Sequence, residues 1–197
     1  MVGTLFAHLR SGRSVLLVGA AGMGKTAILR AVSARAGQTR TTRRPLYCRQ
    51  ASTLKVTLHS LAEELLAVDT DAPHSRDQRP MACRFLRKLS LVKLRRLVMP
   101  RLRSGRYAVL LDHAGPVRGA FATFLDELVE DSGVPIVIAA RSLEHAETGR
   151  LWWIGWKFET MTVPELSPGE ARHLIDSCLE RATGALPDRD DFVNGLL

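Results

Sequence analysis

The feature that most constrains the fold is a glycine-rich segment between a short apolar run and a helical pattern. Its sequence, Gly19-Ala20-Ala21-Gly22-Met23-Gly24-Lys25-Thr26, matches G-x-x-x-x-G-K-[ST] at every fixed position. The preceding run, Ser14–Val18, is rich in Val and Leu and predicts a strand buried on both faces. A helix is predicted from Lys25 to about Ala36, where Gly37 ends it. This order of strand, loop and helix is the context expected of a phosphate-binding loop.

The chemistry of phosphate binding accounts for the residue types in this segment. Backbone N–H groups of the loop and of the helix N-terminus must point toward phosphate oxygens, and glycines permit the turn and the close approach of the ligand. Lys25 would bridge the β- and γ-phosphates, and Thr26 would offer its hydroxyl to Mg²⁺. The predicted nucleotide-binding residues are therefore Gly19, Ala20, Ala21, Gly22, Met23, Gly24, Lys25, Thr26 and Ala27.

An acidic site is predicted at the end of a second buried strand, Tyr107–Leu111. Asp112 follows this strand directly. A phosphate-binding loop requires a carboxylate that holds the metal directly or through a bound water. We therefore expect this strand to lie beside Ser14–Val18 in one sheet, with Asp112 and Thr26 as the metal ligands.

Two further residues at strand ends bear on hydrolysis. His113 follows Asp112 directly, at a position beside the predicted metal site where a second acid would activate a water that attacks the phosphate. A neutral imidazole accepts a proton near pH 7, so His113 is a candidate catalytic residue, and slow or lost hydrolysis is the alternative. Arg141 ends the most hydrophobic strand, Val134–Ala140. A polar group there can reach the γ-phosphate, and an ordinary exposed arginine is the alternative.

The remaining pattern alternates short β-rich runs with longer helical stretches, which predicts an α/β fold with parallel strands covered by helices. The helix beginning near Pro168 has Ser167 as its N-cap and Glu170 at its third position. A basic helix is predicted from Arg79 to about Val98, with Pro100 ending it. The other predicted elements are a strand at Pro45–Gln50, helices at Thr53–Val68 and Val117–Asp131, and a strand within Lys157–Val163.

The positive charge of the chain is concentrated in one segment. Lys and Arg total 28 against 20 Asp and Glu, yet the segment from Arg79 to Arg106 holds ten basic residues and no acid. Within it, Arg84, Arg87, Lys88 and Arg95 fall on one helical arc, and an apolar arc is formed by Phe85, Leu86, Leu89, Val92 and Leu97. A nucleic-acid contact is one interpretation of this segment. A solvated helix face is the other.

Composition excludes several classes of protein. The apolar fraction of 46% is too high for intrinsic disorder, and the longest apolar runs are far shorter than the ~20 residues of a membrane span. The three cysteines, Cys48, Cys83 and Cys178, lack metal-ligand spacing and predict reduced thiols. The first ten residues lack the features of a secretory signal. We therefore expect a cytoplasmic protein with no membrane partner.

Together these segments resemble the AAA+/STAND group of P-loop ATPases, which includes origin-recognition-like, NACHT and NB-ARC-like domains. The resemblance is carried by the phosphate-binding loop, the strands ending at Asp112 and Arg141, and the stretch Pro164-Glu165-Leu166-Ser167-Pro168-Gly169-Glu170-Ala171. It implies a P-loop NTPase three-layer α/β/α sandwich with a central, mostly parallel sheet over residues 1–163. Residues 164–197 would begin a small helical lid. Because that lid would be incomplete, we expect a fragment or a truncated family member.

The resemblance also implies ligands and partners. ATP with Mg²⁺ is the expected cofactor pair, ADP the expected product state, and Arg141 a sensor of the γ-phosphate. In ring-forming relatives an arginine contacts the γ-phosphate of a neighbouring subunit. A homo-oligomer is therefore one option, with Arg150 as a candidate for that arginine and a lone surface arginine as the alternative.

Three functions are compatible with the sequence. The first is a nucleotide-dependent switch with slow, Mg²⁺-dependent ATP hydrolysis. The second is a small-molecule P-loop kinase, although Pro45–Gln50 offers no acid for a substrate. The third, suggested by His113, is a non-hydrolysing nucleotide-binding module that engages DNA or a protein partner.

Overall fold

The computed structural model describes residues 1–38, 43–69, 79–130, 132–141 and 155–181. It divides the chain into two compact units, Met1–Val163 and Pro164–Leu197. The first unit contains, in chain order, α1 (Val2–Arg10), β1 (Val15–Val18), α2 (Lys25–Gln38), β2 (Arg44–Cys48), α3 (Leu54–Asp69), α4 (Arg79–Arg87), α5 (Leu91–Leu102), β3 (Tyr107–Leu111), α6 (Gly119–Glu130), β4 (Ile136–Ala140), a 3₁₀ turn η1 (Gly155–Lys157) and β5 (Glu159–Thr162).

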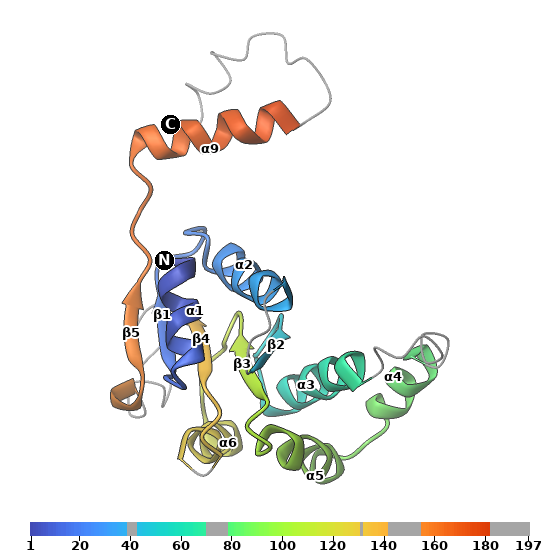
Figure 1. Cartoon of the computed structure of the whole chain (residues 1–197). Helices are drawn as coiled ribbons and strands as arrows, with labels where there is room; N and C mark the ends of the chain where they lie inside the picture. Colours follow the sequence, from blue (N-terminus) through green and yellow to red (C-terminus); the bar gives the residue numbers. More distant parts are fainter. Residues whose placement is uncertain (39–42, 70–78, 131, 142–154, 182–197) are drawn as a thin grey trace. The chain divides into compact units, whose positions relative to one another are not determined.

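The five strands form one sheet in which every pairing is parallel, in the order β2-β3-β4-β1-β5. The expectation that β3 lies beside β1 is wrong, because β4 lies between them (Figure 1). Parallel neighbours are joined by crossovers that pass over a face of the sheet. Sequence order therefore does not fix lateral order. The carboxyl ends of β1, β4 and β3 still lie along one edge of the sheet.

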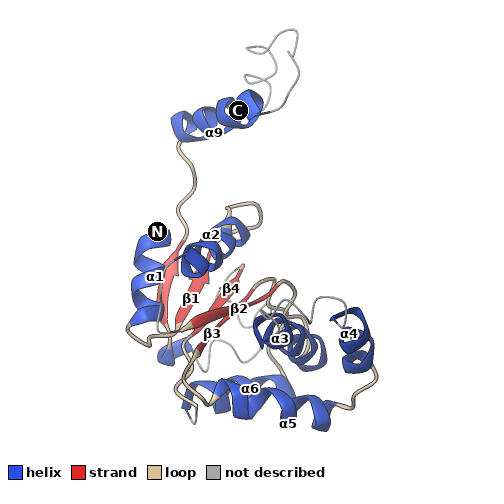
Figure 2. Cartoon of the chain, turned by 45° about the vertical axis from the view of Figure 1, so that its right-hand side comes forward, coloured by secondary structure: helices blue, strands red, loops and turns tan. Residues whose placement is uncertain are grey.

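Helices cover both faces of this sheet, which confirms the predicted three-layer α/β/α fold (Figure 2). Leu16 packs in a core with Leu58 of α3, Leu94 of α5 and Phe124 of α6. The neighbouring residues of β1, Val15 and Leu17, face the other way and pack in a second core, together with the following residues of α1 and α2: Leu5, Phe6, Leu29 and Val32. Strands buried on both faces explain the continuous apolar runs of the sequence.

The helical content differs from the prediction in three places: at α1, at Ser90 and at Pro100. The helix α1 was not predicted, yet Leu5, Phe6 and Leu9 are buried against the sheet. The expected single basic helix is instead two helices, because the Ser90 hydroxyl accepts a hydrogen bond from the N–H of Lys93 and starts a new helix there.

Pro100 does not end α5, which continues to Leu102. Proline removes one N–H and one hydrogen bond from a helix. Met99 and Leu102 are buried on either side of it, however, and extend the apolar stripe of α5. The burial of these side chains keeps the last turn helical.

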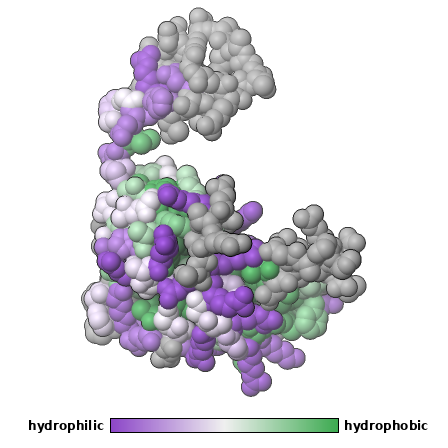
Figure 3. Space-filling view, viewed as in Figure 1, coloured by the Kyte–Doolittle hydropathy of each residue, from purple (hydrophilic) through white to green (hydrophobic). Residues whose placement is uncertain are grey.

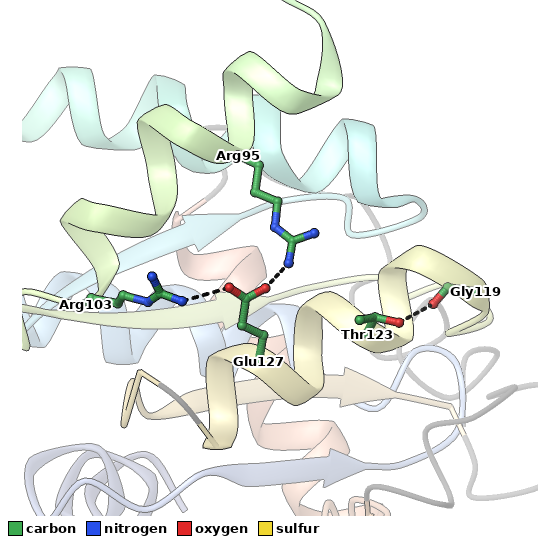
Figure 4. A network of polar contacts seen from close by, with 5 residues as sticks. All are labelled: Arg95, Arg103, Gly119, Thr123 and Glu127. Atoms are coloured by element: carbon green, nitrogen blue, oxygen red, sulfur yellow. Dashed lines mark hydrogen bonds and ion pairs between the residues drawn. The ribbon is translucent and has the colours of Figure 1, made fainter.

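Ion pairs connect α5 and the residue after it to Glu127 of α6. The Glu127 carboxylate accepts hydrogen bonds from Arg95 and from Arg103, the latter at 2.9 Å (Figure 4). On the same helix the Thr123 hydroxyl donates to the carbonyl of Gly119 at 3.4 Å. Two of the ten basic residues of the charged segment are therefore paired with one internal acid.

In the second unit the described element is α9 (Pro168–Arg181). Ser167 and Glu170 form the predicted capping box: the Ser167 N–H donates to the Glu170 carboxylate at 2.9 Å, and the Glu170 N–H donates to the Ser167 hydroxyl at 3.3 Å. The hydrogen bonds that the Ser167 N–H and the Ser167 hydroxyl donate to the Glu170 carboxylate lower the pKa of Glu170. Among the described helices of both units, none combines the length and the apolarity that a membrane crossing requires.

Candidate nucleotide-binding site

A cavity of about 700 Å³ opens at the edge of the sheet where β1, β3 and β4 end. Crevices at the carboxyl ends of strands are the usual ligand sites of open α/β sheets. Its walls come from segments far apart in the sequence: residues 21–27, residues 112–116, residues 139–141, and Arg30 of α2. The fold thus gathers the phosphate-binding loop, Asp112, His113 and Arg141 around one space.

The loop between β1 and α2 has the backbone that its glycines predict. Gly22 and Gly24 adopt φ values of 84° and 81°, a left-handed conformation that a side chain would strain. The Ala20 N–H donates to the Met23 sulfur at 2.9 Å. The Lys25 ammonium donates to the carbonyls of Gly19 and Ala20 at 2.5 and 2.6 Å. Gly19 and Ala20 thus contact the site through their carbonyls, whereas residues 21–27 line the cavity itself.

The charge around Lys25 suits an anion. Partial burial lowers the pKa of Lys25, the nearby Arg141 lowers it further, and Asp112 opposes this effect. Two cations that repel each other in one cavity are stabilised by a ligand carrying several negative charges. Triphosphates are ligands of this kind.

Asp112 is held in a fixed orientation at the base of the cavity. Only 2% of the residue is exposed. One carboxylate oxygen accepts a hydrogen bond from the Tyr47 hydroxyl at 2.7 Å, and the other accepts from the N–H of His113 at 2.9 Å. Burial and the bond to Asp112 both raise the pKa of Tyr47, and a hydrogen bond with Arg30 opposes them.

His113 lies in front of the two predicted metal ligands. Its Nε2 is 3.4 Å from the Thr26 hydroxyl and 3.9 Å from the Asp112 carboxylate. The residue has a φ of 47°, which is uncommon for a side chain larger than glycine. The surrounding loop is held by backbone bonds to the loop after β2, from Ala51 N–H to the Asp112 carbonyl at 2.9 Å and from Gly115 N–H to the Ala51 carbonyl at 3.1 Å.

The oxygen donors at this edge fit Mg²⁺. This ion prefers one or two carboxylates together with substrate phosphates, and it keeps several waters. Asp112 supplies a buried carboxylate and Thr26 a hydroxyl, both near His113 Nε2. Within the described residues no group of three or more His, Cys, Asp or Glu forms a metal cluster.

Two polar side chains at this site had not been predicted: Arg30, which lines the cavity, and Tyr47, which contacts Asp112. Tyr47 reaches Asp112 because β2 pairs in register with β3, which places Tyr47 opposite Leu110. Arg30 lines the cavity one helical turn beyond Thr26. The sequence signal for Arg30 was its distance of four residues from Thr26, which places both side chains on one face of the helix. The predicted Arg150 lies outside the described residues.

The basic segment does not line this cavity. It occupies α4, α5 and the turn before β3. Phe85 and Val92 belong to the apolar arc predicted for one continuous helix, yet they are 63% and 60% exposed. The predicted helix is broken at Ser90. Hydrophobic residues reach the surface near the right-hand end of the first unit in Figure 3, where α4 lies.

Comparisons with known proteins agree with this geometry. Residues 2–192 match a family model described as the AAA ATPase domain. No curated protein sequence matches the chain. Among solved structures, Orc1 of Aeropyrum pernix in complex with DNA is 19% identical, with a TM-score of 0.62 over 95% of this chain and 51% of that one.

Two further solved structures are similar. AMPPCP-bound DnaA from Aquifex aeolicus is 15% identical, with a TM-score of 0.56 over 100% of this chain and 54% of that one. Cdc6p from Pyrobaculum aerophilum is 20% identical, with a TM-score of 0.54 over 90% and 46%. These likenesses show the fold, and the chain spans about half the length of each protein. Since the family model covers nearly the whole chain and the phosphate-binding loop lies where the fold requires it, the chain belongs to the AAA ATPase domain family.

Proposed function

We propose that this domain binds ATP with Mg²⁺ and acts as a nucleotide-dependent switch with slow hydrolysis. The observation that carries the proposal is the single cavity that brings residues 21–27, Asp112 and Arg141 together. Calorimetric titration of the chain with ATP and MgCl₂ tests it. A saturable heat with micromolar affinity is expected, and absence of binding at millimolar ATP would remove the proposal.

Each residue has a distinct role in this proposal. Backbone N–H groups of residues 21–27 would hold the phosphates, and Lys25 would turn from its loop carbonyls toward the β- and γ-phosphates. Thr26 and Asp112 would hold the ion. When bound, Mg²⁺ neutralises charge on the phosphate oxygens. Arg141 would contact the γ-phosphate and so distinguish ATP from ADP.

Slow hydrolysis is proposed because of His113. Its imidazole lies beside Thr26 and Asp112, in the position where a carboxylate would activate water. We expect His113→Glu to raise the single-turnover rate of ATP hydrolysis about tenfold or more, since a well-placed general base contributes ~10²–10⁴ in rate. Radiolabelled ATP with excess protein measures this rate.

The matched control for this experiment is His113→Gln, which adds a neutral side chain of similar length. It should leave the slow rate unchanged. A fall in both variants would instead show that the imidazole itself takes part in hydrolysis.

Residues 164–197 are proposed to begin the helical lid of this family. The capping box of Ser167 and Glu170 fixes the start of α9. We also propose that the protein is cytoplasmic. The free cysteines Cys48 and Cys83 support that location.

We also propose a nucleic-acid contact on α4. Arg84 and Arg87 of α4 are three residues apart and share one face of the helix, and Lys88 lies in the turn that follows; all three are exposed. Exposed Phe85 lies among them. The solved Orc1 structure that shares this fold is a complex with DNA.

Replacing Arg84, Arg87 and Lys88 together by Gln should weaken DNA binding and flatten its salt dependence. Each lost phosphate contact reduces the slope of log K against log salt by about 0.9 on duplex DNA. Fluorescence anisotropy with a labelled duplex between 50 and 200 mM salt measures the slope.

A control variant replaces the exposed arginines Arg10, Arg49 and Arg118 by Gln. It removes the same charge elsewhere and should keep most of the slope. Equal losses in both variants would mean that binding follows net charge and that α4 is not the contact.

A further inference from the structure

Tyr47 contacts the candidate metal carboxylate from a strand that carries none of the predicted site residues. It is the fourth residue of β2, and in-register pairing places it opposite Leu110 of β3. Its hydroxyl donates to Asp112 at 2.7 Å. Because β3 lies between β2 and β4, Tyr47 approaches Asp112 from the side away from β1 and the phosphate-binding loop.

This contact fixes the Asp112 side chain at both oxygens. One oxygen accepts from Tyr47 and the other from the N–H of His113, and the carboxylate is almost completely buried. Rotation of the carboxylate would break both bonds inside the protein, where an unpaired charged oxygen is costly. Each oxygen keeps a further lone pair for an ion.

Tyr47 is itself held in place. Its ring packs against the core between α1, α2 and the sheet, and Arg30 of α2 is hydrogen-bonded to its hydroxyl. Arg30 also lines the cavity. A chain of contacts therefore runs from α2 through Tyr47 to Asp112.

We propose that Tyr47 is a positioning residue that holds Asp112 in the orientation required for Mg²⁺, so that the ion strengthens nucleotide binding. This inference rests on the proposed ATP site and adds a residue to it. Hydrogen bonds to metal-ligating carboxylates commonly account for 10–100-fold in metal affinity. Without Tyr47, the ion would have to order a carboxylate that the protein now orders in advance.

The test is Tyr47→Phe, which keeps the packed ring and removes the hydroxyl. Binding of a fluorescent ATP analogue is measured once with excess MgCl₂ and once with EDTA, and the ratio of the two affinities reports the contribution of the ion. We expect this ratio to fall about tenfold in the variant, while the affinity in EDTA changes less than twofold.

Two comparisons make the result specific. Tyr107→Phe removes a hydroxyl at the opposite end of β3 and should leave the ratio unchanged. In an Asp112→Asn background, which lacks the metal carboxylate, Tyr47→Phe should have no further effect, because Tyr47 acts through Asp112.

An unchanged ratio in Tyr47→Phe, beside Mg²⁺-dependent binding by the wild-type protein, would overturn this inference and leave the ATP site intact. An equal loss in MgCl₂ and in EDTA, with a lower melting temperature, would also overturn it, since Tyr47 would then be structural only. Failure of the wild-type protein to bind the analogue would instead contradict the proposed function.

Discussion

Replacing Lys25 by alanine is expected to weaken ATP binding roughly 100-fold or more. A hydrogen bond to a charged group contributes about 1.5–3 kcal/mol, and in the proposed function Lys25 would bind two phosphates. Losing about 3 kcal/mol corresponds to about 100-fold in Kd. Arg141 remains in the cavity of this variant. It follows β4, however, and cannot take the place of the Lys25 ammonium within the loop. Isothermal titration calorimetry with ATP and MgCl₂ measures the change.

The lysine also stabilises the loop through the carbonyls of Gly19 and Ala20, so the variant needs two controls. Lys25→Met keeps the aliphatic stem and its packing, and it should lose binding to the same extent. Lys55→Ala removes an exposed lysine of α3 that does not line the cavity, and its affinity should equal that of the wild type. ATP affinity that is unchanged in both Lys25 variants would remove the nucleotide site.

The second large effect is expected for Asp112→Asn. Removing the carboxylate charge should lower the Mg²⁺-dependent rate of ATP hydrolysis about 100-fold, because a bound ion contributes several kcal/mol of charge stabilisation in the transition state. The amide oxygen still accepts the hydrogen bond that Tyr47 donates to Asp112, whereas the amide nitrogen cannot accept the bond from the His113 N–H. We therefore expect the fold to be retained with a lower melting temperature. Single-turnover hydrolysis at saturating MgCl₂, with thermal unfolding in parallel, measures both properties.

Asp126→Asn is the matched control for this variant. Asp126 lies on α6, where it pairs with Lys157 at 3.3 Å and is half-exposed. A surface pair of this kind contributes little to stability, and the residue does not line the cavity. Hydrolysis by this control should match the wild type. An Asp112→Asn protein that hydrolyses ATP at the wild-type rate would show that the ion is held elsewhere.

Local chemistry made the centre of the site predictable. A glycine-rich loop that binds phosphate works through its own backbone, so Gly19, Gly24, Lys25 and Thr26 mark it wherever they occur in this spacing. The capping box of α9 is equally local, since its two hydrogen bonds join residues three apart. The strands at Val15–Val18 and Tyr107–Leu111 were evident because parallel strands are buried on both faces.

Residues that depend on packing were predicted less well. The helix α1 was missed because its apolar residues gain their stability from the sheet. Helix α5 passes through Pro100 because Met99 and Leu102 are buried around it. The stability of such a helix depends on how much the burial of its side chains offsets a lost hydrogen bond. That burial occurs on surfaces formed by distant segments, so the local sequence pattern does not reveal it.

By itself the sequence determined an α/β fold of parallel strands covered by helices, the phosphate-binding loop and the acid that follows a buried strand, because each follows from a pattern within short segments. Only the tertiary structure placed β4 between β1 and β3, and only it brought the Tyr47 hydroxyl to Asp112. The reason is that lateral strand order is set by how crossovers pack on the two faces of the sheet. Which side chains meet at its edge is therefore a property of the assembled layers, and spacing along the chain does not encode it.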